Sequence, residues 1–563
     1  MGGLGEFSRS SQGCRSVKLS ILWRNEKRRN LKKTHFCIKI VLKSKLSAIL
    51  FALMRIFLYL CSVYWKVQMA TQLLTILFAF FVQFTDKAGS QHIALSPTAL
   101  EKRAERSIAI DSLDYAVSPI YLDSLQALGC HIYHTSRWLN GATIETDPYT
   151  IQSIAEWTFV DTVYLTRQLR DDNLHEGEED PFGIPSVSLR KQKAENKDTI
   201  DNSNNYSADQ QPLQQSPTWL SDPQTEQLNL HPLHEAGFHG QGITIAVVDG
   251  GFQNVNTLCA FDAVREQILG IYDTTDDTDS VTGTTGNHGV KCFGTIAATT
   301  SDYQGAATAA QYYLIRSEEH KTESPKEMDN WVAAIELADS LGVDILSSSL
   351  GYAMFDDEQH TLSYSDMNGK TTRCSRAATI AARKGMLVVI AAGNEGNKAW
   401  HYISAPADAD SVLTVGAVNI HDSIAAFSSW GPTADGRVKP EVCATGSQTA
   451  LINPLDNSVI YGNGTSFACP IVAGMAACLW SALPNANNME IRQRIIQSAD
   501  RYTLPHDQYG YGIPNAWQAY EQTTDINAIQ SCHTPDVQKV LINGQLWILH
   551  NGEKYNVMGN KHW

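Results

Sequence analysis

The chain has 563 residues, of which 43% are hydrophobic and 18% charged, and these values exclude a disordered protein or a single small module. Its net charge of −15 is unevenly distributed. Residues 1–68, the basic leader, hold 14 Lys and Arg against 2 Asp and Glu, whereas the rest holds 30 against 57. The acidic body argues against nucleic acid as a partner, because phosphate binding needs a basic surface.

The basic leader contains an apolar run at 46–65. The run is long enough for a transmembrane helix, but Arg55 within it is costly in lipid. Alternatively, Met54 and Arg55 begin a secretory signal, or a start at Met69 places a second apolar run at the beginning of the product. We expect export, with a secreted or cell-surface product that contacts the membrane only if an uncleaved apolar segment remains.

Short helix and strand signals follow between residues 69 and 170. Residues 80–85 indicate a strand or the end of the second apolar run, 119–128 have helical spacing, and 130–133 are typical of a strand. Residues 171–219 are rich in Asp, Glu, Asn, Gln and Ser, a composition typical of an exposed linker. The sequence therefore predicts a small α+β domain at 69–170, followed by a linker.

The segment 220–525 alternates apolar strands with helices. Strands are predicted at 243–248, 343–346, 386–390 and 412–415, and helices at 327–341 and 376–384. Strands that are apolar throughout and separated by helices predict a mostly parallel sheet covered on both faces, in one α/β domain.

The last segment, 526–563, carries the signal of a β-hairpin. Residues 546–550 and 554–557 flank Asn551-Gly552, which is typical of a type I′ turn. This tail resembles the short C-terminal modules of secreted Bacteroidetes-type proteins, some of which are sorting signals. A plain structural hairpin is the alternative.

Three polar residues of the segment 220–525 are candidates for chemistry. Asp249 ends an apolar strand, at the edge where open α/β sheets place their sites. His288 precedes a segment of small residues that is typical of a buried helix, and Ser466 begins another. Each alone has an ordinary structural explanation, such as a helix cap for Ser466. Together, their order is that of an Asp-His-Ser catalytic triad.

The residues around these three positions match the motifs of a known family. The matching motifs are Val247–Gly251, His288-Gly289 with Gly294-Thr295, Ser349–Gly351, Ala391–Gly396, Gly464-Thr465-Ser466-Phe467-Ala468 with Pro470, and Gly510-Tyr511-Gly512. In these motifs the chain resembles the subtilisin-like serine proteases, or subtilases, over residues 220–525. The resemblance implies a three-layer α/β fold with a mostly parallel sheet, and an endopeptidase whose partners are protein or peptide substrates.

The resemblance also implies a role for individual residues. His288 would accept the proton of Ser466, and Asp249 would hold the imidazole in place. The side chain of Asn394 and the backbone N–H of Ser466 would bind the oxyanion. The implied substrate-binding residues are Ser349, Leu350, Gly351, Ala391, Ala392 and Gly393. Their small size predicts an open, apolar pocket, across which the substrate lies as an extended strand.

Three features of the sequence depart from the family pattern or add to it. Val290 and Lys291 occupy the stretch in which family members usually carry a second histidine, and this puts the local packing in doubt. Cys292 is either a buried structural thiol or a group that makes the enzyme sensitive to mercurials. Phe467 stands where Met is common.

Two further features lie outside the motifs that match the subtilases, a possible pro-domain and a possible calcium site. The segment 69–170 resembles the inhibitory pro-domains of subtilases, which implies a zymogen with its own pro-domain as a partner; an ordinary accessory domain is the alternative. No cofactor is required. Calcium is possible at the oxygen-rich run formed by Asp273, Asp276, Asp277 and Asp279, but the spacing is not that of an EF-hand and favours a solvated acidic loop.

The seven cysteines that follow the linker are an odd number, so at least one is free or pairs with another chain. Cys443, Cys469 and Cys478 lie in apolar contexts typical of small buried side chains. Two rival functions also stay open: a catalytically silent binding protein with the subtilase fold, and an enzyme that only cleaves itself and then serves as a surface adhesin.

Overall fold

The structure is a computed structural model. The residues that it describes are 77–168, 219–275, 280–283, 286–320, 322–522, and the strand residues between 537 and 562. The predictions for the basic leader, for most of the linker and for the Asn551-Gly552 turn lie outside these residues.

The first described region, 77–168, is an α+β domain on a four-stranded sheet. Its strands, in spatial order, are β2 (His131–Ser136), β3 (Gly141–Thr146), β1 (Phe78–Phe84) and β4 (Val160–Gln168). All pairs are antiparallel. The helices are α2 (Pro97–Glu105), a 3₁₀ turn (Ser112–Asp114), α3 (Pro119–Ala127) and α4 (Pro148–Ala155). The strand and helix predicted at 80–85 and 119–128 are confirmed as β1 and α3.

The second region, 219–522, contains a sheet of seven strands, and every pair is parallel. Their spatial order is β11 (Val442–Thr445), β10 (Leu413–Val418), β9 (Leu387–Ala391), β8 (Ile345–Ser348), β5 (Thr244–Asp249), β7 (Gln311–Arg316) and β6 (Ile268–Asp273). The four predicted strands are confirmed, with ends displaced by one to three residues.

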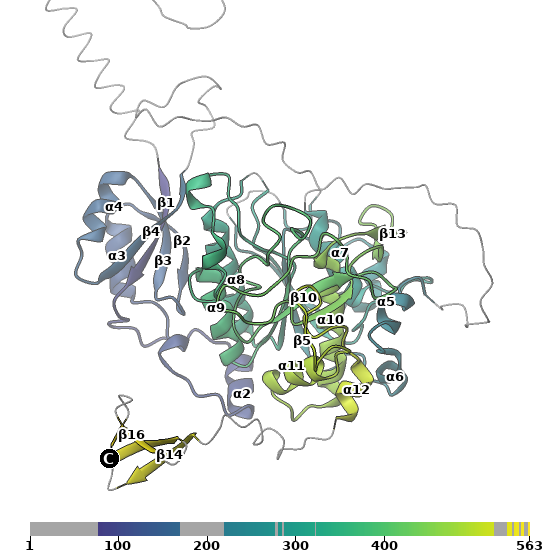
Figure 1. Cartoon of the computed structure of the whole chain (residues 1–563). Coiled ribbons are helices and arrows are strands. Elements are labelled where there is room, and N and C mark those ends of the chain that lie inside the picture. Colours follow the sequence, from purple (N-terminus) through teal and green to yellow (C-terminus); the bar gives the residue numbers. More distant parts are fainter. Residues whose placement is uncertain are drawn as a thin grey trace, which may run out of the picture. The chain divides into compact units, whose positions relative to one another are not determined.

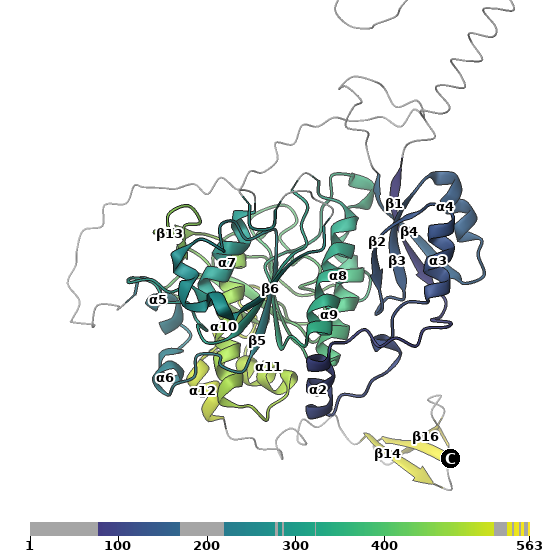
Figure 2. The same ribbon diagram turned by 180° about the vertical axis from the view of Figure 1, so that it is seen from behind.

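Two layers of helices cover this sheet (Figures 1 and 2). One face carries α7 (Asn287–Ala297) and α10 (Thr465–Ala482), and the other carries α8 (Pro325–Leu341) and α9 (Arg373–Arg383). Side chains alternate across the strand, so Val247 packs in the core beneath α7 and α10, whereas Val248 packs in the core beneath α8. The three-layer α/β prediction is confirmed.

Shorter elements surround these layers. They are α5 (Asp222–Glu226), α6 (His231–Glu235), α11 (Asn488–Gln497), α12 (Ala516–Glu521), 3₁₀ turns at Cys259–Gln267, Glu358–His360 and Tyr364–Asp366, and the antiparallel pair β12 (Thr449–Ile452) and β13 (Val459–Gly462). The tail holds β14 (Val537–Ile542), β15 (Gln545–His550), β16 (Glu553–Asn556) and β17 (Lys561–His562). The predicted hairpin is the antiparallel β15–β16 pair.

Helix α10 is long and apolar enough to cross a bilayer by length and composition. It is instead the central core helix of the second region, since 89% of its apolar window is buried. Small residues such as Ala473 and Gly474 let neighbouring segments approach it closely; a Cβ on Gly474 would lie 2.6 Å from the Cβ of Ala306.

The four-stranded sheet of the first region packs on α8. Phe81 of β1 and Trp138 share a hydrophobic cluster with Trp331 and Ile335 of α8. Arg137, in the turn after β2, donates to the backbone carbonyl of Glu336 at 3.1 Å and to the Asp339 carboxylate at 2.6 Å. The two regions therefore meet in one hydrophobic cluster, with buried ion pairs beside it, while the first region keeps a core of its own on the other face of its sheet.

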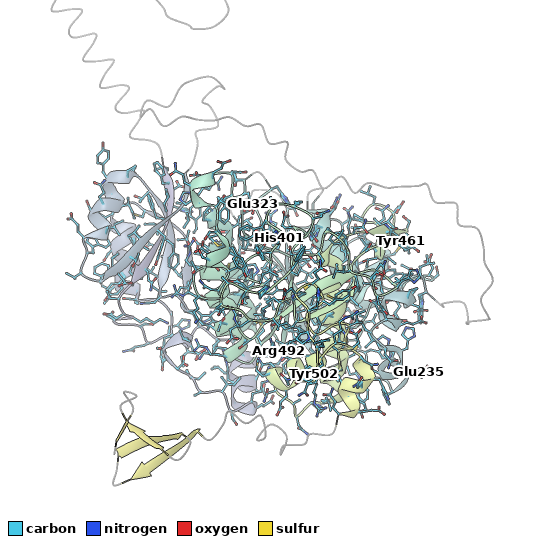
Figure 3. The ribbon with its side chains drawn as sticks, in the orientation of Figure 1. Glu235, Glu323, His401, Tyr461, Arg492 and Tyr502 are labelled. Carbon is cyan, nitrogen blue, oxygen red and sulfur yellow. The ribbon has the colours of Figure 1, made fainter. Side chains whose placement is uncertain are left out.

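The seven parallel strands give their sheet two unlike ends. Arg492 donates to the carbonyl of Val412, just before β10 begins, whereas His401 follows the segment that leaves the end of β9. Figure 3 shows these two labelled residues toward opposite ends of the region. Because all strands run the same way, every loop that leaves a strand emerges at the His401 end.

Candidate active site

The site begins with a buried carboxylate at the end of β5. Asp249 is the last residue of that strand and is fully buried. Its Oδ1 accepts hydrogen bonds from His288 Nδ1 at 2.8 Å and from the Gly250 backbone N–H at 2.7 Å. His288 is the second residue of α7, and a third of its side chain remains exposed. The contact fixes Nδ1 as the donor, so the other imidazole nitrogen, Nε2, is the one available as a base.

Electrostatics favour the protonated form of His288. Burial acts first and disfavours the charge, but the nearby Asp249 carboxylate outweighs it, and the pKa of His288 lies well above its usual value of 6.5. Cys292 Sγ lies 3.8 Å from His288 Nδ1. Burial raises the pKa of Cys292, so this thiol stays neutral and Asp249 is the anion that matters.

Ser466 stands in the first turn of α10, where a proline shapes the backbone. Pro470 lies four residues later and has no N–H, so the Ser466 carbonyl receives no helical hydrogen bond from it. Two side chains donate to that carbonyl instead, Ser349 Oγ at 2.7 Å and Cys292 Sγ at 3.3 Å. The proline in the motif therefore frees an acceptor through which β8 and α7 hold the first turn of α10.

The first turn of α10 also lies against the histidine. The Phe467 and His288 rings have centroids 5.8 Å apart. Among the described residues no hydrogen bond joins Ser466 Oγ to the imidazole. In free enzymes such bonds are often long and tighten only when substrate binds.

Asn394 is bound to the same turn. Its side-chain Oδ1 accepts hydrogen bonds from the Thr465 N–H at 2.9 Å and from Thr465 Oγ1 at 3.1 Å. The amide oxygen thus caps α10 from another segment, and the amide NH₂ is left as the donor that faces the pocket. Gly393 before it has φ +106°, and a Cβ there would lie 2.9 Å from Ser429 Oγ, so this turn requires glycine.

A pocket of about 160 Å³ lies beside Ser466. It is lined by Ser349, Leu350, Gly351, Ala391, Gly393, Asn394, Glu395, Ser404, Thr465 and Ser466. Five of the six predicted substrate-binding residues are in this lining. Ala392 is not: its side chain is fully buried in the core beneath α8 and α9, because successive residues at a strand end point to opposite faces.

Sequence reasoning missed three residues of the pocket lining, Glu395, Ser404 and Thr465. Glu395 follows Asn394 directly and pairs with Lys398 at 2.8 Å, so the pocket is not purely apolar as predicted. Its position in the Ala391–Gly396 motif could have signalled it. Ser404 comes from a loop, and no local sequence signal marks it, since only the tertiary fold brings it beside Gly351.

Neither the cysteine thiols nor the acidic run at 273–279 indicates a bound metal ion among the described residues. The structure describes seven cysteines, which include Cys130 of the first region but not Cys532, and all seven are free. Cys443, Cys469 and Cys478 are buried, as predicted. Asp273 of the acidic run pairs with Arg316, while Asp276, Asp277 and Asp279 lie outside the described residues. A calcium site therefore stays a prediction.

A second acidic group, formed by Glu318, Glu323 and Glu327, has carboxylate oxygens within 4.8 Å of one another. Burial, with the neighbouring carboxylates, raises the pKa of Glu318 to about 8 and that of Glu327 well above its usual value. Proton sharing is enough to keep these carboxylates together, so the group does not by itself indicate a cation.

Comparison with known proteins matches both regions. Residues 240–512 match the Subtilase family, and residues 79–180 match the Peptidase S8 propeptide domain of Bacteroidota.

Individual relatives agree with these matches. The chain is 34% identical over 236 residues to the thermophilic serine proteinase of Bacillus sp. strain AK1, which covers 41% of the chain and 52% of that relative. It is 30% identical to thermitase of Thermoactinomyces vulgaris, over 50% of the chain and 90% of the relative, and 28% identical to the thermostable alkaline protease of Halalkalibacterium halodurans, over 67% and 90%. It thus spans about half the length of the first of these relatives. The chain belongs to the subtilase family of subtilisin-like serine peptidases and carries, ahead of its peptidase domain, a propeptide domain of the Bacteroidota type.

Proposed function

We propose that the chain is made as a zymogen and, once exported, hydrolyses peptide bonds in proteins through Asp249, His288 and Ser466. The observation that carries the proposal is the buried Asp249–His288 hydrogen bond of 2.8 Å beside a pocket that both Ser466 and Asn394 line. The nucleophile and the oxyanion donor would then share one pocket, and the base would come from the neighbouring helix α7.

Acylation would begin at the hydroxyl of Ser466. His288 Nε2 takes the proton as Ser466 Oγ bonds to the carbonyl carbon of the peptide, and Asp249 stabilises the imidazolium without being protonated itself. The negative charge moves to the carbonyl oxygen, which accepts hydrogen bonds from the Asn394 amide and the Ser466 backbone N–H. The C–N bond then breaks as His288 gives its proton to the departing amine.

Deacylation would repeat these steps with water. His288 Nε2 removes a proton from water, whose oxygen attacks the ester carbon, and the same donors hold the oxyanion. The ester bond then breaks, Ser466 recovers its proton from His288, and the carboxylic acid product leaves. No cofactor is needed, because every proton accepted by His288 is returned in the same half-reaction.

The zymogen and the export rest on separate support. The match of residues 79–180 to a propeptide domain supports inhibition by the domain at 77–168, and the cut would fall in the linker at 171–219. The apolar runs near Met54 and Met69 support export and a secreted or cell-surface location.

A labelling experiment tests the proposal. The purified protein is incubated with casein in one reaction and with a fluorophosphonate in a separate one. Ser466→Ala is compared with Ser458→Ala, a change at an exposed serine of the same region. We expect the parent and Ser458→Ala to be labelled and to cleave casein, and Ser466→Ala to do neither. The absence of both labelling and cleavage in the parent would overturn the peptidase proposal.

The same experiment separates the rivals. Labelling at Ser466 without turnover of any added protein would favour an enzyme that only processes itself. Ser466→Ala should also accumulate as the uncut precursor. Normal maturation of that variant would show that another protease makes the cut.

A further inference from the structure

The connection between β1 and α3 of the propeptide domain is unusually long. It spans residues 85–118, here called the arm, where connections of about 4–6 residues are usual. It contains α2 and a 3₁₀ turn. Its first residues bind the propeptide domain itself, as in the hydrogen bond from Tyr121 to Asp86 at 2.7 Å, whereas the basic side chains near the end of α2 bind the peptidase domain.

Three basic side chains at the C-terminal end of α2, two within the helix and one on its capping residue Arg106, bind the peptidase domain. Lys102 Nζ donates to the Gly342 carbonyl at 2.9 Å and to Asp344 Oδ2 at 2.7 Å. Arg106 binds the other oxygen of Asp344. Its guanidinium also lies 4.9 Å from the centre of the Trp480 ring, in a cation–π contact. Within the described residues, the side-chain partners of Lys102 and Arg106 all belong to the peptidase domain, so these contacts do not serve the fold of the propeptide domain.

Arg103, between them, makes the most buried contact. It holds both oxygens of Asp339 at 2.7 and 2.9 Å and also donates to the Lys384 carbonyl. In the reverse sense, Lys384 Nζ binds Asp111 at 2.8 Å and Asp114 at 2.7 Å, both in the arm. Cations and anions thus alternate between the two partners, which fixes a single register for the arm.

The peptidase domain is shaped to receive the arm. Gly385 has φ +93°, and a Cβ at this position would lie only 2.5 Å from Ile108 Cδ1 of the arm. Asp344 is fully buried and also accepts the Thr244 N–H at 2.8 Å, so its position is set by the fold of the peptidase domain. The surface that receives the arm is therefore positioned by the parallel sheet, because Asp344 and Gly385 lie just before β8 and β9.

This surface lies at the end of the sheet remote from Ser466. Asp344 immediately precedes β8 and Ser349 immediately follows it, so the two are separated by the length of the strand, about 16 Å at 3.3 Å per residue. Gly385 likewise precedes β9, whereas Gly393 and Asn394 follow it. The arm thus binds without touching the pocket.

We propose that the arm is a second anchor, which keeps the propeptide domain bound to the peptidase domain after the linker has been cut. Its cleaved form would then dissociate slowly, and peptidase activity would appear with a lag after processing. The proposal rests on the proposed function only in taking the propeptide domain as the inhibitor.

The test uses the full chain in the inactive Ser466→Ala form, so that it does not depend on the peptidase chemistry. A recognition sequence for an added, sequence-specific protease is placed in the linker at 171–219. After complete cutting, the peptidase domain is immobilised through its C-terminus, and release of the propeptide domain is followed by surface plasmon resonance. The test variant is Lys102→Ala with Arg106→Ala, and the matched control is Glu101→Ala with Glu105→Ala, two exposed residues of the same helix.

We expect the propeptide domain of the test variant to leave about 30-fold faster or more, because removal of one partner from buried charge pairs acts mainly on dissociation. The control should stay within about threefold of the parent. Release of the test variant at the parental rate would overturn the proposal.

A second variant guards against misfolding of the propeptide domain. Asp344→Asn keeps an oxygen for the Thr244 N–H but removes the charge that Lys102 and Arg106 bind. It should accelerate release in the same way, with an unchanged circular dichroism spectrum. A parental release rate in this folded variant would overturn the proposal independently.

Discussion

The two ends of the seven-stranded sheet carry different kinds of polar contact. At the end where the strands finish, the first turn of α10 is held by neutral hydrogen bonds, from Thr465 to Asn394 and from Ser349 to the Ser466 carbonyl, although the Asp249–His288 and Arg316–Asp273 ion pairs also lie at this end. At the end where the strands begin, Asp344 and Lys384 bind the arm through buried ion pairs. The first end leaves groups free beside a pocket, whereas the second leaves its charges paired.

This difference follows from what each end has to hold. A site that binds a passing substrate needs donors fixed in place by the protein and directed at an opening. A surface that holds a resident partner gains more from alternating buried charges, because an incorrect register would leave a charge unpaired. Variants at one end should therefore change turnover without changing association, and variants at the other end should do the reverse.

Among the variants that leave Asp249, His288 and Ser466 in place, Asn394→Ala should have the largest effect on turnover. The amide that would bind the oxyanion is lost, so kcat should fall about 10²–10³-fold with little change in KM. The lost cap on α10 should cost about 1 kcal/mol of stability in addition. Steady-state kinetics on a peptide substrate and a thermal melt measure the two effects.

Thr465→Val is the companion variant, since it removes the hydroxyl contacts with Gly393 and Asn394 but keeps the Thr465 N–H that Asn394 accepts. We expect a smaller loss of kcat, about tenfold, from a less well held amide. Equal losses in the two variants would mean that Asn394 acts as a structural cap and not as an oxyanion donor.

Lys384→Met tests the other end from the peptidase side. It leaves Asp114 in a buried position with a weaker partner, Arg103 at 3.4 Å, so the cut propeptide domain should leave about 30-fold faster. The kcat of the mature enzyme should stay within about twofold of the parent, because Lys384 lies before β9 and not beside the pocket. A fall in kcat similar to that of Asn394→Ala would break the separation between the two ends.

Much of the peptidase domain could be predicted from local sequence. The strands β5, β8, β9 and β10 are short, apolar runs bounded by turns, so their type and approximate ends follow from the length of each run and its flanking residues. The Asp249–His288 contact could be expected because the Gly-rich motifs around both residues are specific.

The parts that sequence reasoning missed depend on tertiary contacts. The orientation of Ala392 depends on how β9 ends, and Ser404 reaches the pocket from a distant loop. The arm carries mixed charges that resemble a solvated surface, and only the fold places Asp339 and Asp344 opposite them. Charge pairs between distant segments leave no periodic signal in a single sequence.

Ser349→Ala should have a smaller effect than either of the changes above. It removes the stronger of the two side-chain donors to the Ser466 carbonyl and leaves the weak thiol donor of Cys292. The loss of about 1 kcal/mol would lower kcat about fivefold with KM nearly constant. Ser404→Ala is the matched control, since it alters the same pocket without a contact to the Ser466 carbonyl. If both variants change KM alone, Ser349 serves only as part of the pocket wall.

The pH dependence of kcat/KM should show the smallest effect, a displaced midpoint. His288 must be neutral to accept a proton, and the Asp249 charge raises the pKa of His288 above 6.5 in spite of burial. Activity should therefore rise with pH and reach half its maximum above pH 6.5. Cys292→Ala should leave this midpoint nearly unchanged, because burial keeps that thiol neutral. Asp249→Asn should move the midpoint of the residual activity to lower pH, since burial then acts unopposed on the imidazolium. A parental midpoint at or below pH 6.5 would show that the carboxylate does not outweigh burial in the mature enzyme.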